Sequence, residues 1–137
     1  MERFRNWINK VPTGLLSGVT LALILWLTLA PHPTGEIELP LFPGADKLVH
    51  ALMFGFLTIV ILLERMKHEH WNPLPLGEIG VIAFFTAVTG ILIEVAQHLM
   101  GLGRSFEVLD ILADTSGSFV AAAIWAAVEN KIAKNSD

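Results

Sequence analysis

Hydrophobic residues occur along this chain in four long blocks that are separated by short polar segments. The blocks are Gly14–Ala30, Leu48–Leu63, Ile79–Met100 and about Val108–Val128. Each is close to the ~20 residues that a helix needs to cross the hydrocarbon core of a bilayer. Continuous runs such as LTIVILL lack the apolar and polar alternation of membrane-barrel strands. The pattern therefore predicts an all-α integral membrane bundle.

The segments between the blocks predict the domain organisation and the orientation. The sequence contains no internal repeat or second domain, so we expect one four-helix domain over 1–137, with helices at about 14–30, 46–64, 79–100 and 106–129. Seven of the nine Lys and Arg residues lie before the first block, between the second and third, or in the C-terminal tail. Because positively charged segments stay cytoplasmic, both termini are predicted to be cytoplasmic. The first block is expected to remain as an anchor rather than be cleaved as a signal peptide.

Composition narrows the function further. The chain is 53% hydrophobic and 16% charged, with a mean hydropathy of +0.60, as expected for a membrane protein. The absence of cysteine excludes a disulfide, a thiolate nucleophile and a cysteine zinc site. A net charge of −4 argues against a nucleic-acid partner. We expect no cofactor and no bound metal, and the sequence indicates no particular oligomeric state.

Polar residues inside the blocks are the strongest functional signal. The stretch ILIEVAQHLM contains Glu94, Gln97 and His98 on one helix face. Ionisable residues also begin the second and fourth helices, and all of them fall at the predicted outer end. A charge that faced lipid there would cost ~2.5 kcal/mol or more, so we expect the groups to converge. Singly, each could instead cap a helix or pair locally. The remaining members of this set are Lys47, His50, Arg104, Asp110 and Asp114.

Two further patterns predict how the helices pack. The connection GLGRSFE is short, so the third and fourth helices should form an antiparallel hairpin. In the fourth helix Ala113, Gly117 and Ala121 recur every four residues. Such a stripe of small residues lets another helix approach closely. We expect it to serve packing within the bundle.

Three motifs resemble those of the VanZ-like family of small bacterial membrane proteins, named for an accessory protein of teicoplanin resistance. They are DKLVHALMFGFL at Asp46–Leu57, EVAQ at Glu94–Gln97 and RSFEVLDILADTSG at Arg104–Gly117. The resemblance spans about residues 14–128. It implies a four-helix, multi-pass protein of the bacterial cytoplasmic (inner) membrane, with a link to teicoplanin sensitivity in one branch. Asp114 stands where the family usually has Asn, which adds a negative charge.

The preferred hypothesis is a binding or accessory protein. An outer-leaflet polar pocket would hold an anionic lipid headgroup or a lipid-linked cell-wall precursor against Lys47, His50 and Arg104, since basic side chains suit phosphate. This makes a membrane lipid or a lipid-linked precursor the expected partner. The predicted ligand-binding residues are Asp46, Lys47, His50, Glu94, Gln97, Arg104, Asp110 and Asp114.

Two alternatives remain open. One is a membrane-embedded hydrolase or transferase acting on lipid-linked phosphate or amide bonds, with Glu94, His50 or Asp110 as the catalytic candidates. A metal-dependent form of it would use the carboxylates with His50 as ligands. The other is a proton-coupled transporter, whose buried carboxylates would cycle between protonated and paired states. The sequence favours binding over catalysis.

Overall fold

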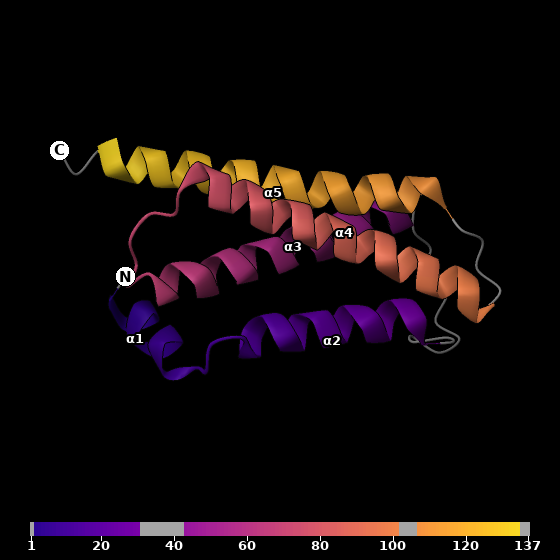
Figure 1. Ribbon diagram of the computed structural model, residues 1–137, viewed down its shortest axis with the longest axis horizontal. Helices are drawn as coiled ribbons and strands as arrows, with labels where there is room; N and C mark the ends of the chain where they lie inside the picture. The colour runs from indigo at the N-terminus through magenta and orange to yellow at the C-terminus, as the bar shows by residue number, and fades with distance from the viewer. Residues whose placement is uncertain (1, 31–42, 102–106, 135–137) are drawn as a thin grey trace.

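The computed structural model describes residues 2–30, 43–101 and 107–134, and all regular structure in these ranges is helical (Figure 1). A short helix precedes four longer ones along the chain. The five elements are α1 Glu2–Lys10, α2 Leu15–Leu29, α3 Ala45–His68, α4 Leu76–Met100 and α5 Val108–Lys134. The expected all-α bundle of four long helices is therefore confirmed, and α1 is an addition that hydropathy did not indicate.

In the part of the chain that the structure describes, three helices are long and apolar enough to cross a membrane, namely α3, α4 and α5. The fourth span is less regular, because α2 has only 15 residues and is joined to α1 at a bend of 75°. Together α1 and α2 pass the same test of length and composition as one bent span. α3 continues four residues beyond the predicted Glu64, since Arg65 and Lys67 are good helix formers that extend the helix beyond its apolar part.

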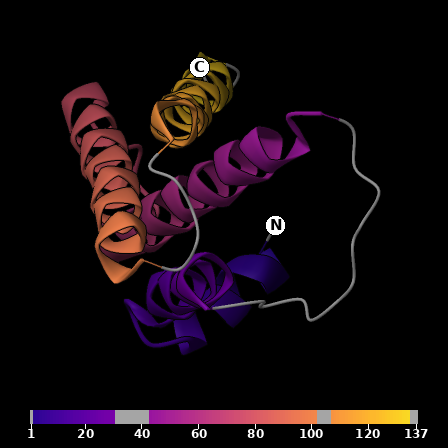
Figure 2. The ribbon, with the colours of Figure 1, turned by 90° about the vertical axis from the view of Figure 1, so that its right-hand side faces the viewer.

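α3 is the central helix of the bundle. Viewed along the helix axes, α2 and α5 lie on opposite sides of α3, and α4 lies beside it (Figure 2). α4 and α5 run antiparallel and pack against each other, as the short connection predicted. α1 and the end of α5 lie at the same end of the bundle, as expected from the number of spans (Figure 1). Which side of the membrane this end faces remains a prediction from the charge distribution.

The predicted small-residue stripe is where α5 contacts α3. A Cβ atom on Gly117 would lie 2.0 Å from the carbonyl oxygen of Ala51. A Cβ on Gly55 would lie 3.1 Å from the Gly117 oxygen and 3.7 Å from the Ala121 methyl. Only glycine allows two helix backbones to come this close. This contact fixes the start of α5 against the start of α3.

The end of the bundle that contains α1 is held by polar contacts that satisfy one another. Glu64 of α3 is 6% exposed, yet both its carboxylate oxygens accept hydrogen bonds from the start of α2. The donors are the N–H groups of Gly14 and Leu16, each 3.0 Å from Oε1, and the Ser17 hydroxyl, 2.6 Å from Oε2. Glu64 thus caps a helix from outside it and complements its dipole.

Candidate functional site

At the opposite end of the bundle, the described residues bring together seven ionisable side chains, six from α3, α4 and α5 and one from Glu107, directly before α5. α3 and α5 begin at this end and α4 approaches its last turn there (Figure 1). We call this set the acidic end, because five of its members are carboxylates. Its members are Asp46, Lys47, His50, Glu94, Glu107, Asp110 and Asp114.

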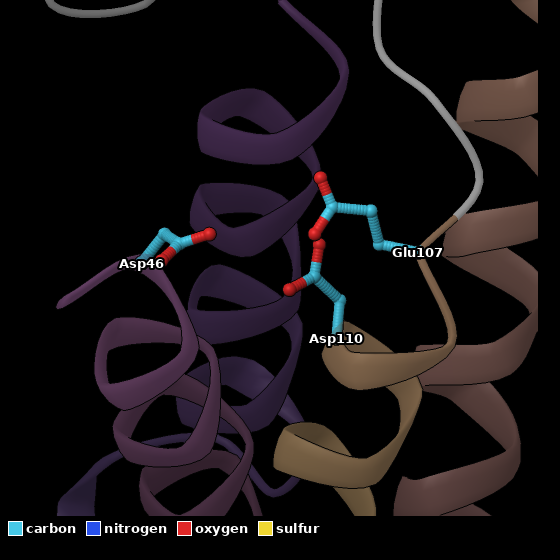
Figure 3. A group of neighbouring side chains, drawn as sticks. All are labelled: Asp46, Glu107 and Asp110. Atoms are coloured by element: carbon cyan, nitrogen blue, oxygen red, sulfur yellow. The ribbon is translucent and has the colours of Figure 1, made fainter. Parts of the chain in front are cut away.

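Lys47 is the centre of the more exposed part of the acidic end. Its ammonium lies 2.7 Å from a carboxylate oxygen of Asp46 and 2.7 Å from Oδ1 of Asp110, and it also pairs with Glu107. Figure 3 shows the three carboxyl groups turned toward a common space between the starts of α3 and α5. Their oxygens lie within 4.8 Å of one another, a spacing that would suit a metal ion. The Lys47 ammonium already supplies a positive charge to this group.

His50 and Asp114 form a second, more buried pair about one helical turn deeper. The Nδ1 atom of His50 lies 3.0 Å from Oδ1 of Asp114, and the two side chains are 11% and 2% exposed. The Asp114 carboxylate also packs on α4, where a Cβ on Gly90 would lie 2.7 Å from Oδ2. Ser118 donates its hydroxyl to the Asp114 carbonyl oxygen at 2.9 Å. Because Gly90 has no side chain, the Asp114 carboxylate can occupy this space.

Glu94 differs from the other carboxylates of the acidic end. It is 2% exposed, and none of the residues that the structure describes forms a hydrogen bond with its Oε2 atom. Its carboxyl group lies within interaction range of the Asp110 carboxyl, the His50 ring and the Glu107 backbone. The Oδ1 atom of Asp110 lies 2.7 Å from the Lys47 ammonium, but this ion pair does not have the geometry of a hydrogen bond. Two buried carboxylates thus lie side by side, an arrangement that requires a proton or a cation to offset their repulsion.

Most of the residues singled out from the sequence meet at this end, but not all. Gln97 is buried, and it donates a hydrogen bond to the Thr28 carbonyl oxygen of α2 at 2.7 Å. His98 is exposed. Arg104 lies outside the described residues. The structure brings together the remaining predicted residues, which are Asp46, Lys47, His50, Glu94, Asp110 and Asp114. Their role as a binding or catalytic site remains a prediction.

Sequence reasoning omitted two residues from the predicted site. Glu107 pairs with Lys47, and its position one turn before Asp110 was an available signal. Gly90 was not recognised, although it lies four residues before Glu94 and therefore on the same helix face. A glycine at that position is informative only when the facing side chain, Asp114, is known. The packing between helices is what identifies it.

A separate hollow lies elsewhere in the described residues. It is an open groove of about 430 Å³ between α2, α3 and α4. Gly18, Leu57 and Phe85 are among its lining residues, and no member of the acidic end lines it. The acidic end is therefore a packed polar cluster that opens through its exposed members, rather than part of this groove.

Charge decides what the acidic end can do chemically. Among the described residues, five carboxylates of the acidic end face one lysine and one histidine, so negative charge is in excess there even when His50 is protonated. Lys47 and His50 are already paired with carboxylates. The cluster is thus suited to take up a cationic group, and an anion would have to compete with carboxylates for Lys47.

Comparison with known proteins agrees with the motifs and the helices. The family model described as VanZ/LLP1 matches residues 4–129, which is most of the chain. No curated protein and no solved structure matches the chain significantly. The family match includes every member of the acidic end. With its apolar spanning helices and this match, the chain is a membrane protein that belongs to the VanZ/LLP1 family.

Proposed function

We propose that this protein binds the polar headgroup of a membrane lipid or of a lipid-linked cell-envelope precursor at the acidic end. The observation that carries the proposal is the gradient of exposure there. Side-chain exposure is 61% for Asp46 and 23% for Lys47, and it falls to 2% for Asp114. A polar path of this kind, leading from the surface into an apolar bundle, suits a ligand whose polar part enters from the membrane interface.

The outer-leaflet location is part of the proposal. The distribution of Lys and Arg predicts that the acidic end faces away from the cytoplasm. The headgroups within reach would then be those of the outer leaflet of the bacterial cytoplasmic membrane. This leaflet also presents the lipid-linked precursors of the cell wall, so the binding proposal includes them.

An anionic headgroup can reach Lys47 by displacing carboxylates that water already solvates. The Asp46 and Glu107 side chains are 61% and 44% exposed. Exposed ion pairs of this type contribute only ~0–1 kcal/mol, so a phosphate can replace them. Asp110 is 13% exposed and would stay on the other side of Lys47. Lys47 is therefore the residue at which we expect a phosphate to bind.

Lipid protection of the purified protein tests this proposal. The full chain in detergent is titrated with phosphatidylglycerol, phosphatidylethanolamine and undecaprenyl phosphate, and the shift in Tm is recorded. We expect at least one lipid to raise the Tm, and Lys47→Ala to reduce that shift. Lys67→Ala is the matched control, because Lys67 donates to the Val11 carbonyl at the other end of the bundle. Equal protection of both variants and the wild type would refute binding at Lys47.

A link to glycopeptides follows if the bound lipid is a cell-wall precursor. Expression of the wild type in a teicoplanin-sensitive bacterium should then alter the inhibitory concentration of teicoplanin. Lys47→Ala, expressed to the same level, should alter it less. An identical effect of both proteins would separate the antibiotic phenotype from the acidic end.

A hydrolase or transferase is the second candidate, and one observation favours it. The His50 imidazole is held by the buried Asp114 carboxylate at 3.0 Å, the relation in which a carboxylate orients a general base. His50 would then activate water toward a lipid-linked phosphate or amide bond. The test is incubation of the purified protein with such lipids, followed by mass spectrometry. Products that His50→Ala fails to form would support catalysis, and unchanged lipids would exclude it for the substrates used.

A further inference from the structure

Glu94 has a buried carboxylate oxygen for which the described residues provide no hydrogen bond. The residue is 2% exposed and lies in α4 about 9 Å before the helix ends, counted at 1.5 Å per residue. The oxygen concerned is Oε2, which none of the described residues contacts with a hydrogen bond. An unsatisfied buried carboxylate is among the most costly groups that a protein can retain. Such a group points to a ligand that supplies donors.

The cations of the acidic end are already engaged elsewhere. Lys47 pairs with Asp46, Glu107 and Asp110. His50 pairs with Asp114. Within residues 43–101 and 107–132, therefore, no side-chain cation forms an ion pair with Glu94, and the His50 ring that lies within electrostatic range of it is paired with Asp114. Because Asp110 lies beside Glu94, the two carboxyl groups together are suited to bind a positively charged group.

We propose that Glu94 and Asp110 bind the primary ammonium group of a lipid headgroup. This inference rests on the proposed function and specifies its ligand. A primary ammonium has three N–H donors, which suits carboxylate oxygens contributed by two different helices. Asp110 also contacts Lys47 at 2.7 Å, so the site for the ammonium is next to the site for a phosphate. A headgroup that carries an amine close to a phosphate satisfies both.

A metal ion fits the same position less well. The three carboxylates with metal-like spacing are Asp46, Glu107 and Asp110, and the Lys47 ammonium lies against all three. Glu94 is not a member of that group. The Lys47 ammonium, 2.7 Å from Asp110 Oδ1, would repel a divalent cation more strongly than a monovalent ammonium group. A primary ammonium group needs only hydrogen-bond acceptors around it.

A series of lipids that differ only in methylation of the nitrogen tests the proposal. Phosphatidylethanolamine, its mono- and dimethyl derivatives and phosphatidylcholine have the same net charge, but the number of N–H donors falls from three to none. Each is titrated against the full chain in detergent, and apparent Kd is obtained from the shift in Tm. We expect phosphatidylethanolamine to bind about tenfold more tightly than phosphatidylcholine, the effect of one charge-assisted hydrogen bond.

Glu94→Gln should abolish this preference while leaving Lys47 in place. The matched control is Glu129→Gln, which neutralises a buried carboxylate at the other end of the bundle, where Glu129 accepts from the Leu74 N–H. The control should keep the tenfold preference. Asp110→Asn is the second variant and should also reduce the preference. Retention of the preference in both acidic-end variants would overturn the proposal.

The outcomes separate this inference from the proposed function. Equal binding of phosphatidylethanolamine and phosphatidylcholine by the wild type refutes the ammonium site, and is the result expected if a shared proton alone lies between the carboxylates. If phosphatidylglycerol still protects through Lys47 in that case, headgroup binding stands. If no lipid protects the wild type, both proposals fail.

A primary ammonium close to a phosphate occurs both in phospholipids and in amine-bearing isoprenyl phosphate precursors. Both are therefore compared, each with its N-acetylated counterpart, which has lost the positive charge. Protection that acetylation removes supports the ammonium site, whichever lipid provides it. The lipid that protects at the lower concentration identifies the source of the headgroup.

Discussion

Two buried glutamates on neighbouring helices show how differently the ends of this bundle are built. Glu64 and Glu94 are 6% and 2% exposed, and both belong to spanning helices. Glu64 accepts three hydrogen bonds from the start of α2, at 2.6 to 3.0 Å. Glu94 has an oxygen without a partner and lies beside a second carboxylate. The two side chains are almost equally buried, but among the described residues only the Glu64 carboxylate has hydrogen-bond donors for both of its oxygens.

The difference teaches that buried charge serves two purposes in this protein. At the end of the bundle that contains α1, a carboxylate provides the hydrogen-bond acceptors that water would otherwise provide, and so it stabilises the start of a short helix. At the acidic end, the carboxylates exceed the cations that face them. A structure selected only for stability would not keep such an excess. We infer that the first end is structural and the second binds a ligand.

The largest effect is expected from Gly117→Ala, which separates the helices that build the acidic end. The new methyl would lie 2.0 Å from the Ala51 carbonyl oxygen, a backbone atom that cannot move aside alone. We expect a loss of about 3 kcal/mol in the free energy of unfolding. Gly80→Ala is the control, because nothing lies within 4 Å of its new methyl. It should stabilise α4 by up to ~1 kcal/mol through helix propensity. Similar unfolding midpoints for both would contradict the close contact.

Glu64→Ala should cost slightly less, about 2–3 kcal/mol, because it removes three hydrogen bonds to a charged group. The start of α2 would lose its cap, which hydrogen exchange of the Gly14 and Leu16 amides should show. Ser17→Ala removes one of the three bonds and should cost about 1 kcal/mol. If Glu64→Ala unfolds like the wild type, the carboxylate is not a structural cap.

His50→Ala should cost about 2 kcal/mol, because it leaves the Asp114 carboxylate buried without its imidazole. A second substitution, Asp114→Asn, removes the buried carboxylate charge that His50→Ala leaves without a partner. We therefore expect the double variant to be more stable than His50→Ala alone, with a coupling energy of at least ~1 kcal/mol. Additive losses in this cycle, measured by denaturant unfolding, would show that the pair does not interact.

Lys47→Met should have the smallest effect of these changes on stability, about 1 kcal/mol. Lys47 is 23% exposed, and two of its three carboxylate partners are well solvated. The loss should shrink in high salt, since exposed ion pairs are screened. A loss that salt does not change would mean that Lys47 is buried more deeply than its exposure indicates.

The sequence predicted six of the seven residues that form the acidic end, and it omitted Glu107. Lys47 and His50 share a helix face, as do Asp110 and Asp114, and each pair lies at the same end of a spanning helix. A charge in lipid is costly, so convergence of these pairs followed from physics alone. Which residue of α3 pairs with which residue of α5 could not be predicted, because the rotation of the two helices about their axes depends on the contact between Gly117 and Ala51.

Other features could not be predicted because their partners lie on helices that are distant in sequence. Gln97 was expected among the ionisable residues, but it donates to a carbonyl oxygen of α2. Glu64 was not singled out, since its cap depends on where α2 begins relative to α3. α1 was missed because its residues are mostly polar, and its position depends on contacts such as Arg5 over the Trp71 ring at 4.9 Å.

The most direct test of the account compares Glu64→Gln and Glu94→Gln in one unfolding experiment. Both changes neutralise a buried carboxylate with almost no change in shape. Glu64→Gln should lower the free energy of unfolding by about 1–2 kcal/mol, because an amide accepts fewer hydrogen bonds than the α2 donors require. Glu94→Gln should leave it unchanged or raise it, because the amide removes a repulsive charge and can donate to Asp110. A loss of stability in Glu94→Gln equal to that in Glu64→Gln would contradict the claim that the acidic end binds a ligand.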